Sequence, residues 1–228
     1  MKLRTTLALS LTSALLAACG GGGDSTPAAT VPSITTTFPL DAAYTKAVTN
    51  GVSLSGTAVD GADTWSLALS ITPATDEVFG GVVRKKALES LTIKRNGAVL
   101  AASSFQNYYS VNPLITQGAR YPDGTYAVQT KTTGTFPVAA KVGDSGPVGI
   151  LTLYANAAKT SVLSTTESTW TLEADTAATA FGCVNSILKN AAGAQTGTAA
   201  GCYKIDTNGN ALGMRYTLSV AGKTLVFK

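Results

Sequence analysis

The residue types that most often carry out chemistry are unevenly represented in this chain. Its 228 residues include no histidine, which removes the commonest general base and the commonest ligand of transition metals. Carboxylates stand close together at Asp60 and Asp63, and at Asp76 and Glu77. The catalytic carboxylates of a glycosidase must flank a cleft at a set separation, which spacing along a chain does not reveal. The sequence therefore indicates no catalytic residue, no metal site and no cofactor.

Cysteine is the reactive residue with the clearest context. The first four residues carry two positive charges, and an apolar run follows that ends in Leu16-Ala17-Ala18-Cys19. A run of about a dozen apolar residues is typical of a secretory signal, since a membrane-spanning helix needs roughly 20. The four residues resemble the lipobox of bacterial lipoproteins. The alternative is an ordinary secretory signal, but Leu16 departs from the small-residue pattern that ordinary cleavage favours.

The lipobox resemblance implies cleavage before Cys19 and attachment of acyl chains, such as palmitate, to this residue. Two or three chains on one residue make a durable membrane anchor. An aspartate directly after the cysteine usually retains such proteins in the inner membrane, and Gly20 stands there instead. The resemblance therefore implies an outer-membrane protein that faces the periplasm.

The same resemblance determines how the other two cysteines are interpreted. With Cys19 lipidated, Cys183 and Cys202 remain, and an oxidising periplasm favours a disulfide between them. A closed loop of about 20 residues corresponds to roughly 3 kcal/mol in the chain-entropy model. A metal site is disfavoured because the chain has neither a C-x-x-C motif nor a histidine.

Gly143-Asp144-Ser145-Gly146-Pro147 resembles the nucleophile motif of chymotrypsin-type serine proteases. That family needs a histidine to take the serine proton, and Lys141 is the only nearby substitute in the sequence. We therefore predict a polar turn between two strands.

Asp206-Thr207-Asn208-Gly209-Asn210 resembles the start of an EF-hand calcium loop. Such a loop needs glycine at its sixth position and a bidentate glutamate at its twelfth, where this chain has Ala211 and Thr217. We predict a hairpin turn instead.

Two stretches are candidates for binding surfaces. Tyr108, Tyr109 and Tyr121 flank a segment, 110–120, that is expected to be irregular, and tyrosine combines apolar area with a polar tip that suits ligand contact. The alternative is an aromatic core that holds the segment in place. Five basic residues at 84–86 and 94–95 suggest a patch for anionic lipid, but charges that protect a solvated strand edge are the preferred interpretation.

The remaining pattern predicts an all-β body. Trp65, Leu67, Leu69 and Ile71 alternate with polar residues and are expected on one face of a strand that ends at Pro73. Turn signals recur at 60–61, 96–97, 122–124 and 208–210, and strands at 8–15-residue intervals are typical of an antiparallel sandwich or barrel. Short strands are expected at 78–83 and 88–94, and no helix is predicted after the signal.

The domain organisation follows from these segments. Residues 1–18 form the predicted signal peptide, residues 19–36 a flexible tether rich in Gly, Ser, Thr and Pro, and residues 37–228 the body. A weak echo between Thr64-Trp65-Ser66-Leu67 and Thr169-Trp170-Thr171-Leu172 raises the option of two lobes, 37–131 and 132–228.

These features favour a lipid-anchored, non-enzymatic envelope protein that binds a partner or supports the envelope. The chain carries 17 basic and 13 acidic residues, two of the basic ones in the signal, and this near-neutral balance gives no support for nucleic acid binding. The sequence does not identify a protein or glycan partner. A periplasmic hydrolase that uses carboxylates and a surface adhesin or receptor component are the alternatives.

Overall fold

The computed structural model describes residues 35–220 and 223–228, without the side chains of residues 218–220 and 223. The signal, the lipobox with Cys19 and most of the tether lie outside the described residues. The described chain forms a single antiparallel sheet of 12 strands, in which each strand pairs with the next one in the sequence. The elements are α1 (Leu40–Asn50), β1 (Val52–Asp60), β2 (Asp63–Phe79), β3 (Val82–Arg95), β4 (Ala98–Ser110), β5 (Ile115–Arg120), β6 (Tyr126–Thr132), β7 (Ser145–Tyr154), β8 (Val162–Ala174), β9 (Thr179–Asn190), β10 (Gln195–Asp206), β11 (Ala211–Val220) and β12 (Lys223–Phe227).

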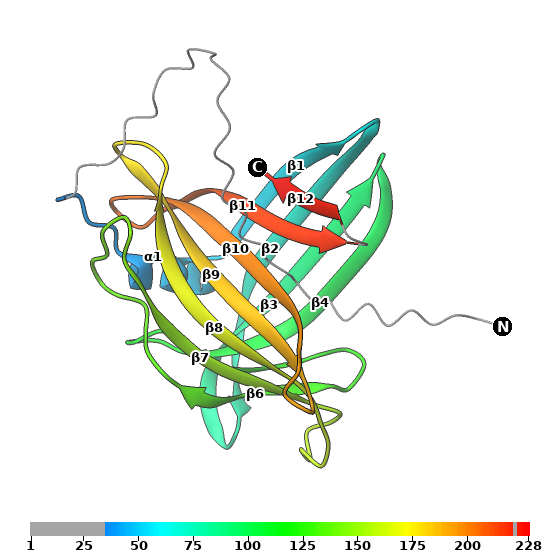
Figure 1. The fold of residues 1–228 in the computed structure, drawn as a ribbon. Helices are drawn as coiled ribbons and strands as arrows, with labels where there is room; N and C mark the ends of the chain where they lie inside the picture. Colours follow the sequence, from blue (N-terminus) through cyan, green and yellow to red (C-terminus); the bar gives the residue numbers. More distant parts are fainter. Residues whose placement is uncertain (1–34, 221–222) are drawn as a thin grey trace.

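The sheet curls until its two ends meet, so that β12 lies beside β1 (Figure 1). Thr57 and Lys228 exchange both backbone hydrogen bonds, at 3.0 and 3.2 Å. Gly56 makes this approach possible, because a Cβ atom there would lie 3.1 Å from the backbone nitrogen of Lys228. The predicted all-β fold is confirmed, and it takes the form of a nearly closed, barrel-like sheet.

Tight turns connect several long neighbouring strands. Asn96 and Gly97 have φ angles of 51° and 83°, which are the left-handed values that a two-residue hairpin turn of type I′ requires. Gly80 and Gly81, with φ angles of 62° and 84°, connect β2 to β3 in the same way. The predicted strand at 78–83 is therefore wrong, because a hairpin turn lies at its centre.

Pro73 does not end its strand as predicted. It lies within β2, opposite Ala87 of β3. On the other side of β2, pairing with β1 begins only at Val52, opposite Ile71. The missing N–H of proline therefore leaves no gap in a ladder of hydrogen bonds.

Helix α1 contradicts the prediction that no helix follows the signal. It follows Pro39, has Asp41 in its first turn, where a negative charge is favourable, and gives way to Gly51. Its buried residues, Leu40, Ala43, Ala47 and Val48, follow the spacing of one helical face. This helix packs against the inner side of the sheet, so closely that a Cβ atom at Gly182 would collide with the Leu40 side chain.

Three hydrophobic clusters fill parts of the interior. One gathers Trp65, Leu67, Leu91, Ile93, Met214, Leu225 and Phe227 near the closing strands. The other two surround α1 and include Trp170, Leu172, Ala180 and Ile205 on one side and Ile71, Ala87, Tyr109 and Leu114 on the other. The first cluster draws on both of the lobes considered from the sequence, and β6 and β7 pair on either side of residue 132.

Candidate functional site

Tyr108 and Tyr109 are neighbours in β4 and lie on opposite faces of the sheet. The segment after them, expected to be irregular, is instead a turn at 111–114 followed by β5. Tyr108 is completely buried on the outer face, where it stacks on Phe79 at 4.3 Å between ring centroids. Tyr109 is buried among residues of α1 on the inner face. The structure therefore does not bring these two candidate ligand-contacting residues together.

Tyr109 contacts a glutamate that the sequence analysis did not single out. Along β3, Ala87, Leu91 and Ile93 are buried in interior clusters and Leu88 is exposed. Since side chains alternate along a strand, Glu89 faces the interior together with the odd-numbered residues. The Tyr109 hydroxyl donates a hydrogen bond to the Glu89 carboxylate.

Further inward-facing residues of β4 and the β5–β6 turn complete this side of the site. Phe105 lies directly opposite Glu89 in the β3–β4 register, and Asn107 is the next inward residue. The Asn107 side chain forms a hydrogen bond with Glu89. Tyr121 packs against Phe105 with ring centroids 5.2 Å apart, so it joins Tyr109 near Glu89.

Helix α1 and strand β10 supply the opposite wall. Tyr44 of α1 stacks on Phe136 at 4.2 Å and lies 5.1 Å from Tyr203 of β10, measured between ring centroids. The Tyr44 hydroxyl donates a hydrogen bond of 3.0 Å to the carbonyl oxygen of Gly182. Tyr203 and Tyr44 both pack against the hydrophobic cluster that contains Tyr109, the residue that donates to Glu89. We call Glu89, Tyr109, Tyr121, Tyr203 and Tyr44 the Glu89 cluster.

Burial perturbs every titrating group of this cluster. It raises the pKa of Glu89, and hydrogen bonds from Asn107 and Tyr109 offset part of that rise. Burial, followed by the negative charge of Glu89, raises the pKa of Tyr121 to about 12 and holds those of Tyr109 and Tyr203 well above 10. Burial alone raises the pKa of Tyr44. All four tyrosines are therefore neutral near pH 7, and Glu89 alone titrates in the acid range.

Unlike Glu77, Glu167 and Glu173, Glu89 has no cationic partner among the described residues. Across residues 35–220 and 223–228, no Lys or Arg forms an ion pair with it. Burying an ionised carboxylate without an opposite charge is costly. The site therefore maintains an unbalanced acidic group in the interior.

Several residues of the cluster keep accessible surface on the inner side of the sheet. Glu89, Tyr44 and Tyr203 are each half-buried, whereas Tyr109 is buried. Ser103, which lies opposite the inward-facing Leu91 on β4, is exposed. Part of the inner side of the sheet is therefore accessible to a molecule of the size of water.

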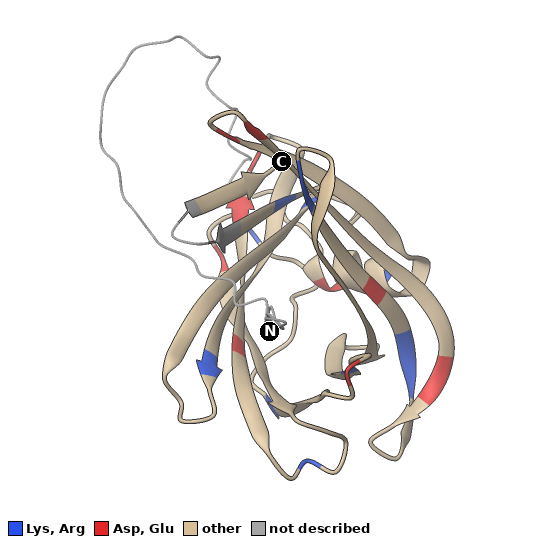
Figure 2. Cartoon of the chain, turned by 90° about the vertical axis from the view of Figure 1, so that its right-hand side faces the viewer, with Lys and Arg blue, Asp and Glu red and all other residues tan. Residues whose placement is uncertain are grey.

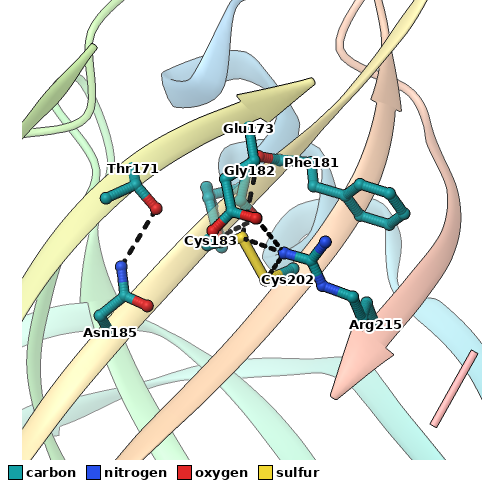
Figure 3. Close-up of polar contacts among 9 residues, drawn as sticks. Thr171, Glu173, Phe181, Gly182, Cys183, Asn185, Cys202 and Arg215 are labelled. Carbon is teal, nitrogen blue, oxygen red and sulfur yellow. Dashed lines mark hydrogen bonds and ion pairs between the residues drawn. A yellow bond between two sulfur atoms is a disulfide. The ribbon is translucent and has the colours of Figure 1, made fainter. Parts of the chain in front are cut away.

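A second cluster lies on the outer face around the predicted disulfide, which the structure contains (Figure 3). Cys183 and Cys202 are directly opposite each other in β9 and β10. Arg215 lies over the Phe181 ring at 4.6 Å, forms an ion pair with Glu173, and has a guanidinium nitrogen 3.5 Å from the Cys202 sulfur. Glu173 and the two sulfurs are close enough together for a metal site, but the disulfide uses both thiolates.

The two loop motifs form turns, as predicted. The Asp144 carboxylate accepts a hydrogen bond of 2.8 Å from the backbone N–H of Lys141, and Ser145 begins β7. At the β10–β11 turn, the Asp206 carboxylate accepts hydrogen bonds from the backbone N–H groups of Asn208 and Asn210, at 2.9 and 2.8 Å. Its oxygens therefore stabilise the hairpin.

The basic residues at 84–86 and 94–95 do not form an unbalanced patch. Lys85 pairs with Asp76 at 2.9 Å, Lys86 pairs with Glu77 at 2.6 Å, and Arg95 pairs with Asp63. These ion pairs join the neighbouring strands β2 and β3, and the Lys85 and Arg95 side chains are exposed, which agrees with the preferred interpretation of solvated strand charges.

No protein-family model, curated protein or solved structure matches this chain. Among the residues that the structure describes, no helix is long and apolar enough to cross a membrane. The candidate site therefore rests on the geometry of the Glu89 cluster.

Proposed function

We propose that this protein is a lipid-anchored protein of the bacterial outer membrane whose barrel-like body binds a small ligand in its interior, without catalysing a reaction. The observation that carries the binding part is the Glu89 cluster. A half-buried carboxylate on the inner side of the sheet, with hydrogen-bond donors, aromatic neighbours and accessible surface beside it, has the character of a small-molecule site. The anchoring part rests on the lipobox resemblance at Cys19, and the outer-membrane location on Gly20.

The anchor is tested by Cys19→Ser in a bacterial host supplied with labelled palmitate. The variant should lose the label, and its body should leave the membrane fraction. Cys183→Ser is the matched control, because it removes a different cysteine and should keep the label. Equal labelling of the Cys19→Ser variant and the unmodified protein would contradict lipidation at this residue.

Ligand access to the interior is tested with a neutral probe, benzyl alcohol, by saturation-transfer NMR on the acyl-free mature chain. Ser103→Trp places a large side chain on the inner face of β4 and should abolish the signal. Ser104→Trp is the matched control, because Ser104 lies opposite Ser90 on the outer face, and it should retain the signal. Equal signals from both variants, or no binding to the unmodified protein, would contradict an interior site.

The two alternatives from the sequence are still predictions. A carboxylate hydrolase of the glycosidase type needs two carboxylates that flank a cleft, and in the described part of the chain no other Asp or Glu contributes to the pKa shift of Glu89. An adhesin or receptor component would use the outer face or the strand tips, and protease accessibility of the body on intact cells would test surface display.

A further inference from the structure

Glu89 is the only glutamate among the described residues that forms no ion pair. Charged residues are sparse over the sheet (Figure 2), and carboxylates on the outer face have cationic partners. Glu77 pairs with Lys86 and Arg120, Glu173 with Arg215, and Glu167 with Lys189. Glu89 has hydrogen bonds from neutral donors only. An opposite charge is therefore the component that this site lacks.

The walls of the site suit an organic cation. The ring faces of Tyr203, Tyr44 and Phe136 follow one another across the interior, with neighbouring centroids 5.1 and 4.2 Å apart. A cation over the face of an aromatic ring is attracted by the ring quadrupole, and the attraction is stronger where water is excluded. Tyr109 and Asn107 hold the carboxylate by hydrogen bonds, so it is oriented before a ligand arrives.

Two other ligand classes fit less well. An anionic ligand would meet the charge of Glu89 without a Lys or Arg ion pair to balance it within the described residues. A calcium ion takes six to eight oxygen ligands, usually including several carboxylates or carbonyls, and this site offers one carboxylate among aromatic rings. An ammonium group needs only a counter-charge and aromatic faces.

We propose that the interior site binds a small organic ammonium ligand, with Glu89 as its counter-ion and Tyr203 and Tyr44 as its aromatic wall. This inference rests on the proposed interior binding function and specifies the class of ligand. It assigns a role to the buried acidic residue that the fold itself does not require.

If the ligand is a cation, its affinity should depend on pH in a definite direction. The groups that act on Glu89 or feel its charge are Tyr109 and Asn107 from β4, Tyr121 from the β5–β6 turn and Tyr203 from β10, and none of them titrates in the acid range. Tyr44 of α1, beside Tyr203, does not titrate there either. A cation prefers the ionised carboxylate. Its affinity should therefore rise with pH through the raised pKa of Glu89 in the free protein and then level off.

The test compares choline with 3,3-dimethyl-1-butanol, which replaces the quaternary nitrogen by carbon and has almost the same shape. Isothermal titration calorimetry on the mature chain should show choline binding about ten-fold tighter or more, the factor expected for one charge-assisted contact. Glu89→Gln should remove this preference. Glu167→Gln is the matched control: it neutralises a carboxylate that pairs with Lys189 on the outer face and should keep the preference.

A second variant covers the case in which Glu89→Gln does not fold. Tyr203→Leu removes an aromatic face and should weaken choline binding several-fold more than binding of the neutral alcohol. Equal affinities for choline and the alcohol, or a preference that survives Glu89→Gln, would overturn the ammonium assignment. If neither compound binds while benzyl alcohol does, the ammonium assignment fails and interior binding stands. If benzyl alcohol also fails to bind, the proposed function itself fails.

Discussion

Tyr108 and Tyr109 share a peptide bond, and the environments of their hydroxyl groups are electrostatic opposites. Tyr108 donates to Gln106 at 2.9 Å and accepts from Arg120 at 3.0 Å, and Arg120 pairs with Glu77. Tyr109 donates to Glu89, which has no such cation. Hydrogen bonds and charges from Lys86 and Arg120 lower the pKa of Glu77, whereas burial raises that of Glu89.

This contrast separates charges that serve the fold from a charge that is available for binding. The outer cluster of Phe79, Tyr108 and Tyr126 is closed by Arg120, whose guanidinium lies 5.1 Å from the Tyr108 ring centroid. Its polar groups satisfy one another. The Glu89 cluster keeps accessible surface and an unbalanced charge. A site whose charge is balanced only by a bound ligand should be less stable without the ligand than a site whose charges are balanced by the protein's own residues.

The largest loss of stability should come from removing the Tyr108 ring on the outer face. Tyr108→Ala deletes a fully buried ring and should lower the free energy of unfolding by about 3–5 kcal/mol, as other large aromatic deletions do. Urea denaturation followed by circular dichroism measures this loss. Tyr121→Ala, at a half-buried ring, should cost less, and an equal loss would contradict the assignment of Tyr108 to the core.

The disulfide should rank next. Converting both Cys183 and Cys202 to alanine opens a loop with a sequence separation of 19 and should lower the free energy of unfolding by about 3 kcal/mol. The unmodified protein should show the same loss in reducing buffer. Benzyl alcohol binding should be unchanged, because the disulfide lies on the outer face, and lost binding would show that the two faces are coupled.

Removing one hydroxyl group compares the two tyrosines directly. Tyr109→Phe deletes a hydrogen bond to a buried carboxylate and should lower the free energy of unfolding at pH 7 by about 1.5–3 kcal/mol, the range for bonds to charged groups. Tyr108→Phe deletes bonds that other groups partly replace and should cost about 1 kcal/mol. Chemical denaturation of both variants measures the two losses. A larger loss for Tyr108→Phe than for Tyr109→Phe would contradict the proposed difference between the two hydroxyl environments.

The smallest expected effect is that of Glu89→Gln on the free energy of unfolding, and it depends on pH. The pKa of Glu89 is raised in the folded state above the ordinary 4.5, so the unfolded chain releases this proton first as pH rises. The free energy of unfolding therefore falls from about pH 4.5 through the raised pKa, and this fall is absent in Glu89→Gln. The variant should match the unmodified protein near pH 4 and have a higher Tm at pH 7, by roughly 2–4 °C per kcal/mol recovered. A lower Tm at pH 7 would contradict the unbalanced charge.

Features set by short-range chemistry were predictable from the sequence. The Asn96-Gly97 turn forms because those residues tolerate left-handed φ angles. Trp65, Leu67 and Ile71 are buried on the face that their alternation indicates. The disulfide between Cys183 and Cys202 was also predicted, from cysteine parity and the compartment that the lipobox resemblance implies.

Features that depend on distant partners were not predictable in the same way. Pro73 lies inside a strand because β1 begins too late to need its N–H, and α1 forms where its apolar face meets strands from both halves of the chain. Tyr108 and Tyr109 carry no sign of which face each occupies. Glu89 did leave a signal, since it interrupts the inward series of Ala87, Leu91 and Ile93, but its neighbours on β10 and α1 become visible only in the fold.

The seam between Thr57 and Lys228 has a consequence for how the chain acquires its structure. Every pairing between the 12 named strands joins consecutive strands, whereas the seam brings β1 together with a residue beyond β12. Contacts between distant parts of a chain form late, because the entropy of closing the loop must be overcome first. Until β12 is in place, β1 presents an unpaired edge, which is the kind of edge that promotes aggregation. The seam is therefore the point at which an open meander becomes a protected molecule.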